Sequence, residues 1–167
     1  MAVPVYIRSL IFTLIAPATV GGWLPYWLAK STIDGQMFGK APGLPITDIV
    51  GYTLLVIGAM IYFWCVYDFT FIGRGTPAIF DPPKNLVIRG LYKYVRNPMY
   101  VGVLTAILGQ VLIYGSPAIL IYALCWFFVF YLFVRWYEEP ALCKQFGDDY
   151  FRYAQHVNRW IPSFRSK

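Results

Sequence analysis

Four long apolar runs, separated by polar, glycine-rich or proline-rich segments, dominate the pattern of the chain. Each run approaches the roughly 20 residues that an α-helix needs to cross a lipid bilayer. The runs cover residues 6–28, 48–67, 98–114 and 118–137. The segment Gly115-Ser116-Pro117 favours a tight turn between the third run and the fourth. We therefore predict four membrane-spanning helices, of which the last two form a hairpin.

Prolines are expected to interrupt two of these helices. Pro17 and Pro25, with two glycines between them, predict a kink in the first run. Pro140 follows the fourth run, and a residue that precedes proline disfavours helical geometry. We therefore expect the fourth helix to break at Glu139.

A stretch after the fourth run, residues 141–153, has apolar side chains at helical spacing. They are Leu142, Phe146, Tyr150 and Tyr153. Such a pattern is typical of an amphipathic helix that lies on the membrane surface. The same helix could also close over a bound ligand.

The composition agrees with a membrane protein and limits the kinds of partner. The chain has 167 residues, of which 59% are hydrophobic, too many for an ordinary soluble domain. Its net charge of +6 favours an anionic lipid surface, because no basic tract or base-stacking module indicates nucleic acid. Three cysteines and one histidine have no metal-ligand spacing, so we expect no metal site and no disulfide framework.

Basic residues predict how the chain is oriented. They concentrate between the second and third runs and in the tail, whereas the hairpin turn has none. Because basic loops stay on the cytoplasmic side, we expect both termini, the central loop and the active site to be cytoplasmic. We therefore predict a single all-α domain, an integral membrane helical bundle of about four transmembrane helices with a C-terminal amphipathic cytoplasmic helix. Its parts are N-terminal transmembrane helices at 1–69, a cytoplasmic cofactor loop at 70–97, a helical hairpin at 98–137 and a cytoplasmic tail at 138–167.

Two adjacent acids, Glu138 and Glu139, lie where the fourth apolar run ends. Negative charge is unfavourable at a helix C-terminus and costly near lipid, so intramembrane acids are candidates for a function. Arg135 lies four residues before Glu139, and this spacing predicts an ion pair on one helix face. Glu138 then remains available for a cationic ligand.

The start of the third helix carries a second candidate group. Asn97 is a good N-cap and Pro98 suits the first helical position. Three tyrosines and two basic residues surround this cap, which a purely structural cap does not require. A helix N-terminus binds carboxylates, and tyrosines can stack on a flat heterocycle. The upstream segment Gly73-Arg74-Gly75 permits close approach of a ligand, but by itself it fits a plain turn better.

These motifs, in this order, resemble those of the membrane methyltransferases that include isoprenylcysteine carboxyl methyltransferase and the phospholipid N-methyltransferases. The matching segments are Arg96-Asn97-Pro98-Met99-Tyr100-Val101-Gly102, Glu138-Glu139 and Phe146-Gly147-x-x-Tyr150-x-x-Tyr153. The resemblance spans roughly residues 70–162. It implies a small all-helical enzyme that uses S-adenosyl-L-methionine.

The resemblance also implies which residues form the site. The cofactor-binding residues would be Leu86, Val87, Tyr92, Asn97, Pro98, Met99 and Tyr100, with Glu138 or Glu139 holding the ammonium end. Arg135 and Glu139 would be catalytic, Arg135 at the place of a substrate-handling arginine in the carboxyl methyltransferases. Those enzymes typically have histidine where this chain has Asn97, whereas asparagine appears at this position in phospholipid methyltransferases. An amide cannot titrate, so acid–base work at this position is not expected.

The methyl acceptor stays open at this point. A lipophilic or membrane-embedded acceptor is expected to approach from the bilayer, with an isoprenylcysteine-type carboxylate, a phospholipid amine, or a small thiol or amine as candidates. One alternative is an NADPH-dependent membrane reductase related to sterol reductases, although phosphate groups favour arginines over an acidic pair. Another is a membrane adaptor without enzymatic activity.

Overall fold

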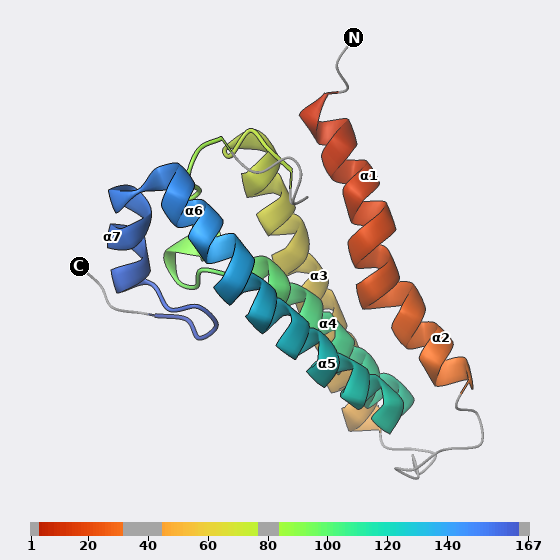
Figure 1. The fold of residues 1–167 in the computed structure, drawn as a ribbon. Helices are drawn as coiled ribbons and strands as arrows, with labels where there is room; N and C mark the ends of the chain where they lie inside the picture. The colour runs from red at the N-terminus through yellow and green to blue at the C-terminus, as the bar shows by residue number, and fades with distance from the viewer. Residues whose placement is uncertain (1–3, 32–44, 77–83, 164–167) are drawn as a thin grey trace.

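The computed structural model describes residues 4–31, 45–76 and 84–163, and in these residues the chain is all-helical (Figure 1). The principal helices are α1 (Val5–Ala18), α2 (Leu24–Ser31), α3 (Pro45–Phe71), α4 (Pro98–Tyr114), α5 (Pro117–Phe133), α6 (Glu139–Phe146) and α7 (Asp148–His156). Two π-helical turns, η1 (Thr19–Trp23) and η3 (Val134–Glu138), connect helices without interruption, and a 3₁₀ turn, η2 (Gly90–Lys93), precedes α4. The prediction of an all-α bundle is confirmed.

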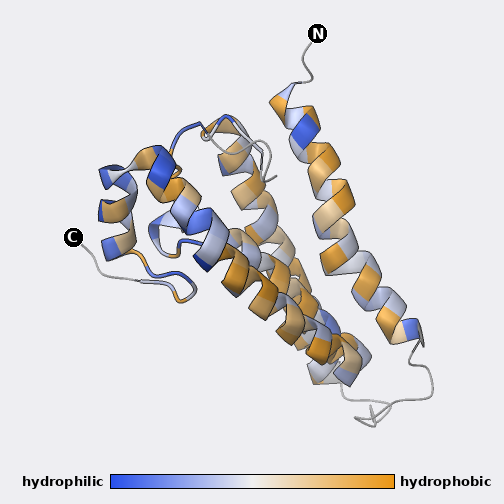
Figure 2. Ribbon diagram, viewed as in Figure 1, coloured by the Kyte–Doolittle hydropathy of each residue, from blue (hydrophilic) through white to orange (hydrophobic). Residues whose placement is uncertain are grey.

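Three continuous helical stretches are long and apolar enough to cross a membrane. They are Val5–Lys30, Ile46–Phe71 and Pro117–Phe146. Helix α4 is also apolar but has 17 residues, or about 26 Å at 1.5 Å per residue. Apolar residues follow these helices, whereas polar residues concentrate on α6, α7 and the adjoining loop (Figure 2). The fold is therefore consistent with the predicted membrane helical bundle, with three helices of membrane-spanning length and a fourth, shorter apolar helix.

Helices α3 and α4 pack with their backbones in unusually close contact through two pairs of glycines. A Cβ atom built on Gly58 would lie 2.5 Å from the carbonyl oxygen of Gly102. One built on Gly109 would lie 2.6 Å from the carbonyl oxygen of Gly51. Small residues at such crossings let membrane helices approach closely, where van der Waals packing drives association. The glycines thus fix α4, which carries one wall of the site, against α3.

Substituting Gly58 with alanine is expected to lower the thermal unfolding midpoint of the detergent-purified protein. The added methyl group would overlap backbone atoms of α4, and overpacking of this kind typically costs about 1–3 kcal/mol. Gly22→Ala is the matched control, because a Cβ at Gly22 meets nothing within 4 Å. Unfolding of Gly58→Ala at the wild-type temperature would contradict the close packing.

The predicted interruption of the first span takes the form of the π-helical turn η1. A π-helical turn leaves backbone carbonyl groups without their usual partners. The Tyr122 hydroxyl donates to the carbonyl oxygen of Val20 at 2.8 Å, and the Gln110 amide donates to that of Gly21 at 2.6 Å. Side chains of α4 and α5 therefore satisfy the turn and attach the first span to the bundle.

The fourth span continues past the acidic pair, so the predicted break at Glu139 was wrong. The chain stays helical from α5 through η3 into α6, and the Glu139 N–H bonds the carbonyl oxygen of Val134, five residues earlier. Proline lacks an N–H, and its ring clashes with the preceding turn of a regular α-helix. The wider π-helical turn before Pro140 accommodates the proline without ending the helix.

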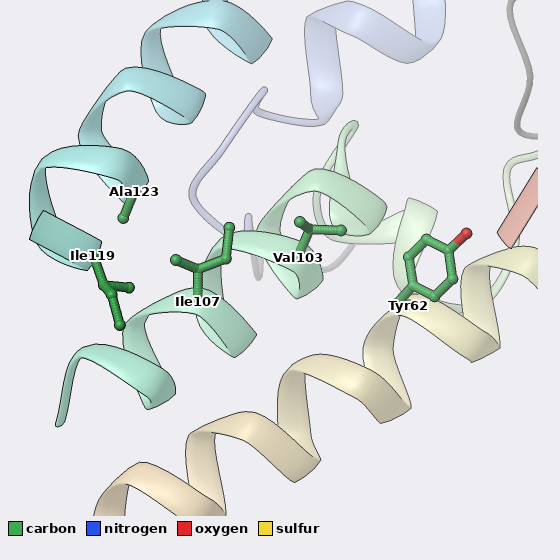
Figure 3. Packing of buried hydrophobic residues seen from close by; sticks show 5 residues of the cluster. All are labelled: Tyr62, Val103, Ile107, Ile119 and Ala123. Carbon is green, nitrogen blue, oxygen red and sulfur yellow. The ribbon is translucent and has the colours of Figure 1, made fainter. Parts of the chain in front are cut away.

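The core lies between α3, α4 and α5 and is drawn in Figure 3. Its buried residues are Tyr62, Val103, Ile107, Ile119 and Ala123. Near the beginning of α1, the Thr70 hydroxyl donates to the Ser9 hydroxyl at 2.8 Å. This bond places the start of α1 beside the end of α3, at the same end of the bundle as the site.

The tail folds back onto the segment before α4. The stretch predicted as one amphipathic helix is two, α6 and α7, separated at Gly147, whose φ of +54° favours glycine. The chain after α7 pairs with the segment before α4. The backbone N–H of Arg96 donates to the carbonyl oxygen of Asn158 at 2.8 Å, and the backbone N–H of Ser163 donates to the carbonyl oxygen of Tyr94 at 2.7 Å. The central loop and the tail therefore lie together, as their shared charge pattern predicted.

Candidate active site

A cavity of about 170 Å³ lies where the central loop, the helical hairpin and the tail meet. Seven residues of the predicted site line it: Leu86, Val87, Tyr92, Asn97, Tyr100, Glu138 and Glu139. Pro98 and Met99 do not. Pro98 is fully buried at the first position of α4, and Met99 faces a neighbouring apolar cavity.

Several lining residues were not assigned to the site from the sequence. They are Phe69, Thr76, Arg96, Phe133, Tyr137, Ala141, Leu142, Gln145, Tyr150 and Tyr153. Arg96, Tyr150 and Tyr153 belong to the motifs that carry the resemblance, so a signal for them was present. Phe69 and Thr76 lie at and beyond the end of α3, and no spacing pattern distinguishes them.

Glu138 contributes a carboxylate to the cavity wall. The Tyr100 hydroxyl donates to its Oε2 at 2.9 Å, which joins α4 to the end of the fourth span. Among the described residues no basic side chain pairs with this carboxylate. An acid that is shielded from water without a cationic partner is costly, and a bound cation would offset that cost.

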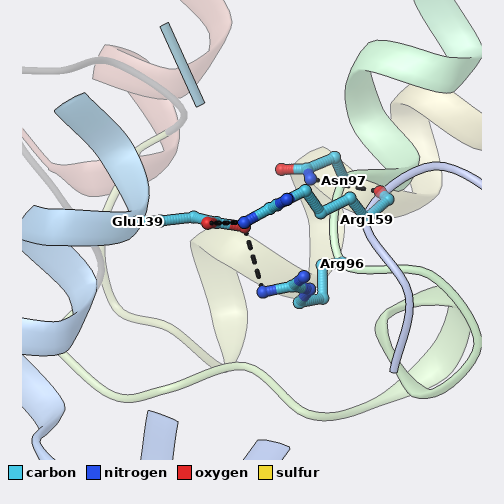
Figure 4. A network of polar contacts seen from close by, with 4 residues as sticks. All are labelled: Arg96, Asn97, Glu139 and Arg159. Carbon is cyan, nitrogen blue, oxygen red and sulfur yellow. Dashed lines mark hydrogen bonds and ion pairs between the residues drawn. The ribbon is translucent and has the colours of Figure 1, made fainter. Parts of the chain in front are cut away.

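Glu139 has entirely different surroundings (Figure 4). Arg159 donates to both of its oxygens at 2.7 Å, and the Nη1 of Arg96 lies 2.9 Å from Oε1. A two-pronged arginine–carboxylate pair of this kind is strong and directional. These hydrogen bonds to Glu139 raise the pKa of Arg159 above its usual value. Glu139 thus joins the loop, the fourth span and the tail.

The predicted ion pair between Arg135 and Glu139 is not formed in the described part of the chain. Arg135 lies in η3 and is exposed, and it does not line the cavity. In a π-helical turn, residues four apart no longer lie above one another as they do in an α-helix. The catalytic role of Arg135 remains a prediction.

Asn97 is buried and occupies the N-cap position of α4 as predicted, but its side chain makes no capping hydrogen bond. Its amide instead donates to the carbonyl oxygen of Arg159 at 3.1 Å. Asn97 therefore attaches Arg159, the tail residue that binds Glu139, to the start of α4. Pro98 occupies the first helical position as predicted.

Three tyrosines of the loop and tail, Tyr92, Tyr150 and Tyr153, are buried in the cavity wall. The Tyr153 hydroxyl donates to the Tyr92 carbonyl oxygen at 2.7 Å. Burial raises the pKa of Tyr92 and Tyr153 above the usual value, and raises that of Tyr150 to about 12. These side chains are therefore neutral hydroxyl groups at physiological pH, able to donate hydrogen bonds but not to act as bases.

A second cavity of about 350 Å³ adjoins the first and is almost entirely apolar. It lies among α1, α3, α4 and α5 and shares Tyr100 and Phe133 with the polar cavity. The Tyr100 ring contacts that of Phe130, which contacts Trp126, with centroid separations of 4.6 and 5.2 Å. Tyr100 thus separates a charged compartment from an aromatic one.

Comparison with known proteins agrees with this arrangement. The family model described as phospholipid methyltransferase matches residues 46–149, more than half of the chain. The match runs from α3 to the beginning of α7, and it includes the loop, the hairpin and both glutamates of the site. No curated protein and no solved structure matched. On the strength of the family match, the chain belongs to the phospholipid methyltransferase family.

Proposed function

We propose that this protein transfers the methyl group of S-adenosyl-L-methionine to a lipophilic acceptor in the membrane. Membership of the family supports methyltransferase activity on a membrane lipid-type substrate. The observation that carries the finer proposal is the Glu138 carboxylate. It lies in the wall of a cavity, bound by Tyr100 and by no basic residue of the described chain.

The residues around the cavity fit the cofactor. Glu138 supplies a carboxylate for its ammonium group. The rings of Tyr92, Phe133 and Tyr137 line the same space, and aromatic faces attract both flat heterocycles and cations. When bound, S-adenosyl-L-methionine supplies an electrophilic methyl group on a sulfonium.

The chain's contribution to the reaction is positioning and the exclusion of water. Methyl transfer from a sulfonium is an in-line displacement, which needs alignment of the reacting groups more than acid–base chemistry. Tyr100 holds Glu138 in place, and Glu139 closes the tail over the cavity through Arg96 and Arg159. The aromatic lining keeps water away from the reacting centre. No step requires Asn97 to titrate.

The acceptor approaches through the apolar cavity. Its hydrocarbon part lies among α1, α3, α4 and α5, and its reactive group reaches the polar cavity beside Tyr100 and Phe133, which line both. A phospholipid amine is the acceptor that the family match favours. We propose further that the site faces the cytoplasm, since the basic residues of the loop and tail surround it.

Transfer of a radioactive methyl group tests this function. Purified protein in vesicles that contain phosphatidylethanolamine is expected to move label from S-adenosyl-L-methionine into extracted lipid. Vesicles of phosphatidylcholine, whose nitrogen is already fully methylated, are the matched control. Folded wild-type protein that labels no phospholipid, isoprenylcysteine or small thiol or amine would overturn the proposal.

A further inference from the structure

The charges beside Glu139 do not balance. Arg96 and Arg159 share this one carboxylate, so the group carries one excess positive charge. The side chain of Arg159 is 33% exposed, whereas that of Arg96 is only 12% exposed. Water can therefore compensate Arg159 far better than Arg96, and the excess charge is concentrated on the side chain that lines the cavity.

Arg96 also has hydrogen-bonding capacity that the described chain does not use. Its Nη1 bonds Glu139, and its guanidinium group also hydrogen-bonds the Tyr150 side chain. Its Nε is buried without a hydrogen-bond partner in the described part of the chain. A guanidinium group has five N–H donors in a rigid plane, which matches the two oxygens of a carboxylate.

The backbone next to Arg96 adds positive potential. Arg96 lies two residues before α4, a helix of 17 residues whose first N–H groups have no partner within the helix. The positive end of a helix dipole stabilises anions within its first turn. Glu138, in contrast, gives the wall of the same cavity a negative charge without a basic partner in the described chain. The cavity therefore carries both a cationic group and an anionic one.

A cavity with one surplus charge of each sign is complementary to a zwitterion. We propose that Arg96 binds the carboxylate of the amino-acid end of S-adenosyl-L-methionine, while Glu138 binds its ammonium group. This inference rests on the proposed function and adds the residue that recognises the anionic half of the ligand. Arg96 thus has two roles, since it also holds Glu139.

The affinities of two ligands for wild type and one variant test this role without an activity measurement. The ligands are S-adenosylhomocysteine and its decarboxylated analogue, S-adenosyl-3-thiopropylamine, titrated calorimetrically into wild type and Arg96→Gln. Wild type is expected to prefer the carboxylate-bearing ligand by about tenfold or more. In Arg96→Gln the ratio of the two affinities is expected to fall close to one. If the role of Arg96 were purely structural, the substitution would lower the affinity for both ligands by the same factor and leave the ratio of the affinities unchanged.

Arg159→Gln is the matched control, because it also removes one arginine from Glu139 but leaves Arg96 in place. It is expected to retain the wild-type preference. A wild type that binds both ligands equally would overturn the inference even if Arg96→Gln does not fold, and so would a preference that survives in that variant. Failure of the proposed function is distinguishable, because folded wild type would then bind neither ligand.

Discussion

Glu138→Gln is expected to weaken binding of S-adenosylhomocysteine by about 10- to 100-fold while the protein remains folded. The amide keeps the shape of the side chain and an oxygen that can accept the Tyr100 hydrogen bond, but it loses the negative charge. A hydrogen bond to a charged group contributes about 1.5–3 kcal/mol, which corresponds to this range of affinity. Calorimetric titration of wild type and variant measures the difference.

A shorter ligand shows whether the loss arises at the ammonium group. Methylthioadenosine has the adenosine and sulfur of the cofactor but lacks its amino-acid end. Glu138→Gln is expected to bind this ligand as wild type does. An equal loss for both ligands would mean that Glu138 shapes the cavity without contacting the ammonium group, and the site assignment would fail.

Glu139→Ala is expected to destabilise the docked tail rather than to affect the ligand alone. The substitution leaves Arg96 and Arg159 without their shared carboxylate, and removing one partner of a buried ion pair costs about 3–5 kcal/mol. The lower end of this range applies because Arg159 is one-third exposed. Thermal unfolding and the rate of tryptic cleavage in the tail, which contains Lys144 and Arg152, measure the effect.

Arg135→Gln is the matched control for this prediction. Arg135 is exposed and makes no ion pair with Glu139 in the described chain, so its variant is expected to unfold and to be cleaved as wild type is. Similar destabilisation in both variants would instead support the pairing inferred from sequence spacing. A Glu139→Ala protein as stable as wild type would contradict the structural role of Glu139.

Most of the fold follows from the sequence because bilayer-length apolar runs leave the backbone few alternatives to a helix. The errors lie where the folded chain does not follow the preference of the local sequence. Pro140 predicted a break, but η3 widens the helix around it. Glu139 had a local candidate partner in Arg135, yet its partners lie 20 residues later and 43 residues earlier, at Arg159 and Arg96. Spacing rules for helix faces do not reach such distances.

The candidate site was predictable where a motif identified a residue whose side chain also points into the cavity. Tyr100 and Glu138, which the family resemblance assigned to one site, are joined by a hydrogen bond. Met99 does not join them, because successive residues on a helix point about 100° apart, and it faces the apolar cavity instead. Phe69 reaches the site only through the packing of α3, for which the local sequence contains no signal.

Titration of detergent-purified wild-type protein with S-adenosylhomocysteine, in parallel with NADPH, tests the central claim most directly. The Glu138 carboxylate in an aromatic cavity predicts saturable binding of S-adenosylhomocysteine and none of NADPH, whose phosphates lack a suitable cluster of free arginines in the described part of the site. Well-folded protein that binds no S-adenosylhomocysteine, or that binds NADPH in its place, would contradict the assignment of this cavity.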